Sequence, residues 1–210
     1  MGSVYGGAII DFDFHPIVDE VLEPEVRQPI DGTETPEARA LKALKDAGMV
    51  ALRALRISPR VALDAPISYD DATLSSFSFT EYAVGVVNGK TLVLNWMLGA
   101  DQQSTFKGFE ACSREHGPVL VFYYDDRTST YAYSLFRDGK RVRLRVGGPS
   151  VPTSEEEDEG ELLPGEPMVV GEEDEVDIAT IEDRVVEAFL GQPLNQCDGL
   201  LLAHFEDAEA

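Results

Sequence analysis

The chain has 210 residues, a hydrophobic fraction of 43% and a formal net charge of −22. That length suits one substantial core, and the hydrophobic fraction argues against disorder throughout the chain. The negative field opposes binding to nucleic acid and to anionic membrane surfaces, and it attracts cationic proteins.

The first predicted elements are a strand and a long helix. Apolar and polar residues alternate from Tyr5 to Phe14, which predicts a half-buried strand. A helix is predicted to begin at Thr35-Pro36-Glu37 and to end near Arg56, because the threonine can cap it and proline suits its first turn.

One face of this predicted helix is basic. Its basic residues are Arg39, Lys42, Lys45, Arg53 and Arg56. Such a charged face is usually solvated. The alternative is that it pairs with an acid-rich segment of the same chain.

A hairpin is predicted next. Tyr82 to Val87 and Lys90 to Trp96 are expected to pair across Asn88-Gly89, because this dipeptide adopts the positive φ angles of a type I′ turn. A short helix is then predicted from Ser104 to Glu115, where Gly117-Pro118 follows.

Three antiparallel strands are predicted after that helix. They run from Val119 to Tyr124, from Tyr131 to Phe136 and from Arg141 to Val146, with Asp138-Gly139 between the last two. In the third strand, alternation predicts one cationic face of Arg141, Arg143 and Arg145 and one core face of Val142, Leu144 and Val146.

An acid-rich segment, Ser154 to Asp183, holds most of the excess charge. Between Arg145 and Arg184 the chain has fourteen acidic residues and no lysine or arginine. Its composition predicts a mobile loop. The predicted partner-binding residues are its two acidic runs and part of its apolar centre: Glu155, Glu156, Glu157, Asp158, Glu159, Glu161, Leu162, Leu163, Glu172, Glu173, Asp174 and Glu175.

The C-terminal residues are predicted to complete the same domain. Asp177 can cap a helix that ends before Gly191, and Leu200 to Phe205 can form a closing strand. The predicted organisation is an α+β core at 1–148, the acid-rich segment at 149–176 and a C-terminal helix and strand at 177–210. The fold class expected is α+β, with a mostly antiparallel sheet, built from the hairpin and the three-strand meander, and about three helices packed on it.

The sequence contains no complete catalytic signature, and no cofactor or metal is predicted. Ile10-Asp11-Phe12-Asp13, at the end of the predicted first strand, resembles the first motif of the haloacid dehalogenase phosphatases. That resemblance implies a Mg²⁺-dependent phosphatase with Asp11 as nucleophile and Asp13 as general acid, and Asp125-Asp126 could imitate the distal metal-binding acids of the family. This enzyme is the alternative to a binding protein.

The C-terminal half is similar to a class of uncharacterised bacterial domains. The similarity rests on Tyr131-Ala132-Tyr133, Asp138-Gly139, Arg141-Val142-Arg143 and the stretch from Gly160 to Glu166, and it implies no activity. In its acidity and its lack of catalytic motifs the chain also resembles immunity proteins of bacterial toxin systems.

These observations favour a non-enzymatic module that binds a basic protein. The more specific hypothesis is that this partner is a bacterial toxin, which the module inhibits. A third hypothesis is structural: the acid-rich segment pairs with Arg141, Arg143 and Arg145 of its own chain.

Two cysteines, no basic leader and no long apolar run predict a cytoplasmic protein.

Overall fold

The computed structural model describes residues 4–18, 35–58, 60–73, 78–100, 102–152, 156–166, 178–197 and 199–207. Within these residues, ten strands form one antiparallel sheet: β1 (Val4–Ile10), β2 (Arg60–Ala62), β3 (Ile67–Ser68), β4 (Tyr82–Val87), β5 (Lys90–Leu94), β6 (Val119–Asp125), β7 (Thr130–Arg137), β8 (Lys140–Gly147), β9 (Glu157–Gly160) and β10 (Leu201–Asp207). The helices are α2 (Pro36–Ala54), α3 (Tyr69–Ala72), α4 (Trp96–Ala100), α5 (Gln102–Glu115) and α6 (Ile178–Leu190), with 3₁₀ turns at His15–Ile17 and Leu194–Cys197.

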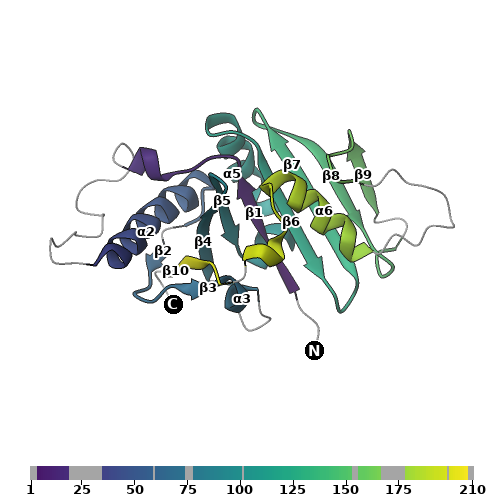
Figure 1. The fold of residues 1–210 in the computed structure, drawn as a ribbon. Coiled ribbons are helices and arrows are strands. Elements are labelled where there is room, and N and C mark those ends of the chain that lie inside the picture. The colour runs from purple at the N-terminus through teal and green to yellow at the C-terminus, as the bar shows by residue number, and fades with distance from the viewer. Residues whose placement is uncertain are drawn as a thin grey trace.

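The strand order is β2-β10-β4-β5-β1-β6-β7-β8-β9, and β3 pairs with β10 beside this path. Figure 1 shows β9 at one edge of the sheet, and β10 near the other edge between β2 and β4. The last strand of the described chain is therefore an inner strand of the sheet. The predicted α+β class, with a mostly antiparallel sheet and helices packed on it, is confirmed.

Helices cover both faces of the sheet. On one face, α2 and α5 pack their apolar side chains, such as Leu52 and Phe109, against alternate residues of the central strands. On the other face, α6 packs Val185 and Leu190 against the remaining residues of the same strands, whose side chains point to that side. Alternate side chains of a strand point to opposite faces, so β1 contributes Ile10 to one core and Ile9 to the other. We call these the α5 face and the α6 face.

Local signals placed several elements correctly. The Thr35 hydroxyl accepts a hydrogen bond from the Ala38 backbone N–H at 3.3 Å, which caps α2 as predicted. Asn88 and Gly89 have φ angles of 53° and 74°, as the predicted hairpin turn between β4 and β5 requires. The predicted strand from Tyr5 ends early, at Ile10, because the chain bends at Asp11.

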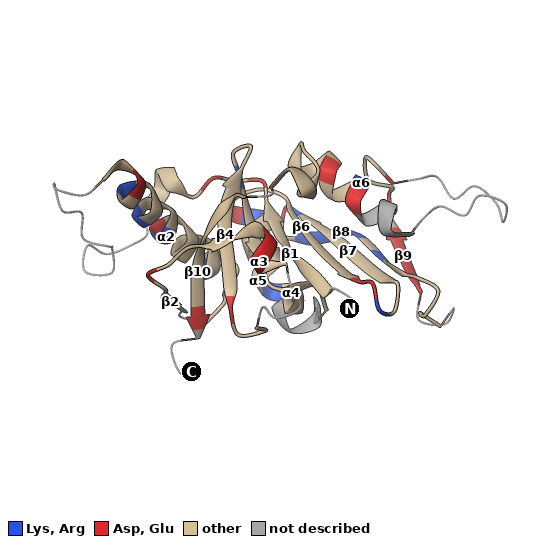
Figure 2. Ribbon diagram, turned by 60° about the horizontal axis from the view of Figure 1, so that its bottom comes forward, with Lys and Arg blue, Asp and Glu red and all other residues tan. Residues whose placement is uncertain are grey.

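The predicted basic face of α2 is not fully solvated, because Lys45 is an exception. This side chain is buried, and its Nζ donates to the Asp64 backbone carbonyl at 3.2 Å. Helix α2 packs against β10 and β4, whereas β9 lies at the opposite edge (Figure 2). The described part of the acid-rich segment is therefore far from this helix and does not pair with it.

Candidate functional site

Part of the acid-rich segment forms an ordered edge of the sheet. Residues 156–166, which we call the acidic strap, begin beside β8, and their strand β9 pairs with it so that Asp158 lies opposite Arg145 and Glu159 opposite Leu144. The predicted mobile loop is therefore wrong for 157–160, because the arginines of β8 offset the repulsion between neighbouring carboxylates. Figure 2 shows the acidic strand beside the basic residues of β8.

Arg143 is the centre of this contact. Its side chain is 0% exposed, and it binds the equally buried Glu166 carboxylate through Nε at 2.9 Å and Nη2 at 3.0 Å. Its Nη1 donates to the Asp158 carboxylate and, at 3.0 Å, to the Glu159 backbone carbonyl. Burial alone would lower the pKa of Arg143, but the hydrogen bonds to Glu166 and Asp158 raise it overall. A buried guanidinium needs such partners, so Arg143 fastens both ends of the strap to the sheet.

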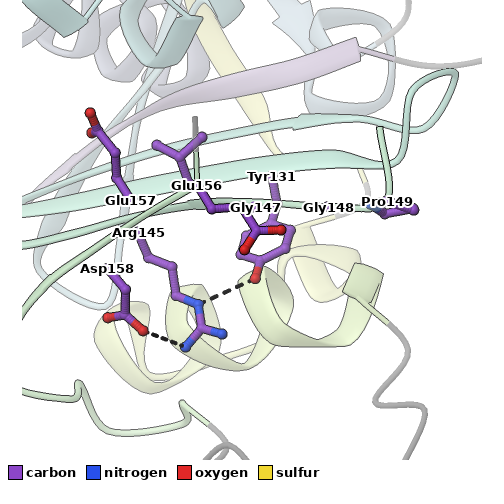
Figure 3. Close-up of a pocket in the computed structure, with 9 residues that line it drawn as sticks. Tyr131, Arg145, Gly147, Gly148, Pro149, Glu156, Glu157 and Asp158 are labelled. Carbon is purple, nitrogen blue, oxygen red and sulfur yellow. Dashed lines mark hydrogen bonds and ion pairs between the residues drawn. The ribbon is translucent and has the colours of Figure 1, made fainter. Parts of the chain in front are cut away.

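Arg145 lies two residues further along the same face. Its Nε donates to the Tyr131 hydroxyl at 3.2 Å, and its Nη1 is 3.6 Å from the Asp158 carboxylate. Figure 3 shows the guanidinium between these two groups. Nη1 is buried and makes no hydrogen bond. The hydroxyl of Tyr133, which is opposite Arg145 in β7, is also buried without a hydrogen bond, and burial together with Glu166 raises its pKa.

Arg141 does not share a face with Arg143 and Arg145, so that prediction is wrong. The register between β7 and β8 shifts between Leu135 and Phe136: Arg143 lies opposite Leu135, and Arg141 lies opposite Phe136. This bulge inserts one extra residue and moves Arg141 to the α5 face. There its guanidinium lies 5.0 Å from the centre of the Phe106 ring of α5.

The predicted core face of β8 is confirmed in part. Leu144 is buried, whereas Val142, the extra residue at the bulge, is 39% exposed. Side chains therefore alternate between the two faces of the sheet as predicted only from Arg143 to Gly147.

The acids of the strap divide into two groups. The paired acids are Asp158 and Glu166, both bound to Arg143, and Glu159, whose carboxylate lies 3.2 Å from Arg141. The unpaired acids are Glu156, Glu157 and Glu161, which are exposed and form no ion pair with any described residue. The two predicted apolar residues also divide: Leu162 is 48% exposed, and Leu163 is half-buried beside α6.

The remaining predicted partner-binding residues, Glu155, Glu172, Glu173, Asp174 and Glu175, lie outside the described residues, and so does the predicted cap Asp177.

A polar pocket of about 520 Å³ opens beside Arg145 on the α6 face. Tyr131, Arg145 and Gly147 form one side of it, and residues 156–158 of the strap form another. A Cβ atom at Gly147 would lie 2.8 Å from the Tyr131 hydroxyl oxygen, so the phenol can lie across β8 only because this residue is glycine. The Glu157 side chain points away from Arg145, toward the α5 face (Figure 3).

The sequence signals for this site were partial. Alternating arginines close to an acidic run indicated the pairing, and Tyr131 and Tyr133 share a face by the same period of two. No local pattern marks Glu166, which reaches Arg143 from 23 residues further along the chain.

Asp11 and Asp13, the candidate phosphatase residues, each have a different partner. Asp11 accepts from Lys90 Nζ at 2.6 Å, and Asp13 lies 2.7 Å from His15 Nδ1. Because β1 and β6 are antiparallel, Asp125 lies opposite Val4, at the end of β1 far from Asp11. In the described residues no three His, Cys, Asp or Glu side chains gather as metal ligands do.

Comparison of the chain with protein-family models, curated proteins and solved structures found no match. In the described part of the chain no helix is long and apolar enough to cross a membrane.

Proposed function

We propose that this protein is a non-enzymatic module that binds a basic surface of another protein through the unpaired acids of its strap. The observation that carries the proposal is the division of the strap. The paired acids hold it against β8, which leaves Glu156, Glu157 and Glu161 exposed along one edge of the sheet, at the two ends of β9.

Ordering of the strap supports this function in energetic terms. A loop that folds only on binding loses conformational entropy at that moment, and this loss weakens the complex. Here the contacts of Arg143 already fix the backbone between Asp158 and Glu166, which includes Glu161. Glu157 is held by the pairing of β9 with β8, and the Glu156 backbone N–H donates to the Pro152 carbonyl at 3.2 Å. The unpaired carboxylates are therefore presented to a partner at a low entropic cost, and their charge speeds its approach.

A cationic toxin inhibited in the bacterial cytoplasm is the specific partner that we propose. Carboxylates can occupy the positions of phosphates in the cleft of an enzyme that acts on nucleic acid. The exposed Leu162, beside the unpaired Glu161, supplies an apolar contact of the kind that such an interface needs at its centre.

The experiment is affinity capture from a lysate of the source organism at about 50 mM and about 300 mM salt. The test variant carries Glu156→Gln, Glu157→Gln and Glu161→Gln. The control variant carries Glu115→Gln, Glu187→Gln and Glu206→Gln, which change the net charge equally at other surfaces. We expect the test variant to lose a basic protein that the wild type and the control both retain, and the wild type to retain less of it at the higher salt.

Retention of every captured protein by the test variant would contradict the proposal. Equal loss from both variants would show that only the net charge matters, and it would also contradict a role for the strap.

A further inference from the structure

Strand β9 leaves one edge of the sheet open within the described residues. It is the last strand of the path, and all four of its residues are exposed. An edge strand presents backbone N–H and C=O groups that can pair with an added strand. Arg143 already donates to the carbonyls of Glu159 and Gly160, so the open backbone lies toward the Glu157 end.

The two unpaired acids at that end face opposite sides of the sheet. Glu157 lies opposite Val146, and its side chain points to the α5 face. Glu156 precedes it and lines the pocket on the α6 face. Adjacent side chains of an extended segment also point to opposite faces. Two adjacent basic residues in an added strand would therefore meet one carboxylate on each face.

The pocket suits a cationic side chain. Its lining includes two acidic side chains, Glu156 and Asp158, and the one guanidinium of Arg145, whereas the Glu157 side chain points to the opposite face of the sheet. Its volume of about 520 Å³ exceeds what a single lysine or arginine side chain requires. The same wall already binds a guanidinium, because Tyr131 and Asp158 hold Arg145 from two sides.

We infer that the partner adds an extended segment to β9 as a further strand, and that this segment carries two adjacent lysine or arginine residues. One basic side chain enters the pocket beside Glu156, and the next lies against Glu157 on the α5 face. This inference rests on the proposed function and specifies how the basic partner binds.

The test uses synthetic peptides with a central Lys-Arg pair between β-branched residues. Two further peptides carry N-methyl groups on alternate residues, one on the odd and one on the even positions, and a fourth separates the two basic residues by one threonine. Binding to the full chain is measured by fluorescence anisotropy at about 50 mM salt. Only alternate residues of an added strand hydrogen-bond to the edge. We therefore expect one N-methylated peptide to bind about tenfold more weakly than the parent and the other to bind as the parent does.

The protein variants locate the contact. Glu156→Gln and Glu157→Gln should each weaken binding of the parent peptide, whereas Glu187→Gln, with the same charge change on α6, should not. Moving the basic residues apart puts both on one face, so the fourth peptide should bind more weakly than the parent.

Equal binding of both N-methylated peptides, or weakening of both, would overturn strand addition, and so would failure of the parent peptide to bind. The proposed function is tested separately, by the affinity capture with the triple variant. If the variant with Glu156→Gln, Glu157→Gln and Glu161→Gln loses its captured partner while the two methylated peptides bind equally, the acids bind a basic surface without adding a strand.

Discussion

Arg143 shows how far a single residue can depart from its sequence pattern. Its spacing from Arg141 and Arg145 predicts one shared cationic face, but a bulge moves Arg141 to the other face, and the strap buries Arg143 completely. The spacing did indicate pairing with acids. The burial depends on Glu166, whose approach is a tertiary contact that no local pattern encodes.

His116 gives a testable pH dependence at the residue scale. Its ring packs against Phe12 and Phe14, with ring centres 5.2 Å and 5.0 Å away. Burial lowers the pKa of His116, and the nearby Glu115 opposes this only in part. Below the unfolded pKa of about 6.5 the unfolded chain takes up the proton more readily than the folded one. The contribution of His116 to stability should therefore be lost as the pH falls below that value.

The measurement is the free energy of unfolding by urea at about pH 7.5 and about pH 5.5. The variant His116→Phe keeps an aromatic ring but does not titrate. It should lose less stability over this interval than the wild type. Equal losses would show that burial of His116 has no part in the acid sensitivity.

Turn chemistry predicted elements better than charge composition did. Asn88-Gly89 and Asp138-Gly139 each mark a hairpin that the structure contains, because few residues adopt the positive φ angles that such turns need. The acid run was predicted as a loop, since composition reports only the repulsion between neighbouring acids. Strand β9 forms because β8 supplies arginines from another part of the chain.

The Asn88 turn also links two elements, and this link is testable. Its Nδ2 donates to the Leu190 backbone carbonyl at 3.3 Å and to the Gln192 side-chain oxygen at 3.1 Å, so the hairpin tip caps the end of α6. Asn88→Gly keeps the positive φ and removes both hydrogen bonds. We expect it to lower the free energy of unfolding by about 1 kcal/mol.

Asn88→Ala is the companion variant, because it removes the same hydrogen bonds and also strains the backbone. It should cost about 1 kcal/mol more than Asn88→Gly. A glycine variant as stable as the wild type would mean that the cap contributes nothing.

At the scale of the whole molecule, the sequence predicts the class of the fold but not its strand order. The meander of β6, β7 and β8 follows from neighbouring strands and short turns. The position of β10 between β2 and β4 depends on contacts between distant parts of the chain. The distribution of acids along the sequence, with fourteen between Arg145 and Arg184, indicated a local acidic feature. Which of its acids are paired could be learned only from the register of β8 and β9.

The central claim is that the strap contains acids that hold the fold and acids that remain open to a partner. Two triple variants with the same charge change test it by urea unfolding. One carries Asp158→Asn, Glu159→Gln and Glu166→Gln; the other carries Glu156→Gln, Glu157→Gln and Glu161→Gln. The first should lose about 3 kcal/mol or more, because Arg143 is left buried without its counter-ions. The second should stay within about 0.5 kcal/mol of the wild type. Equal losses in the two variants would contradict the division.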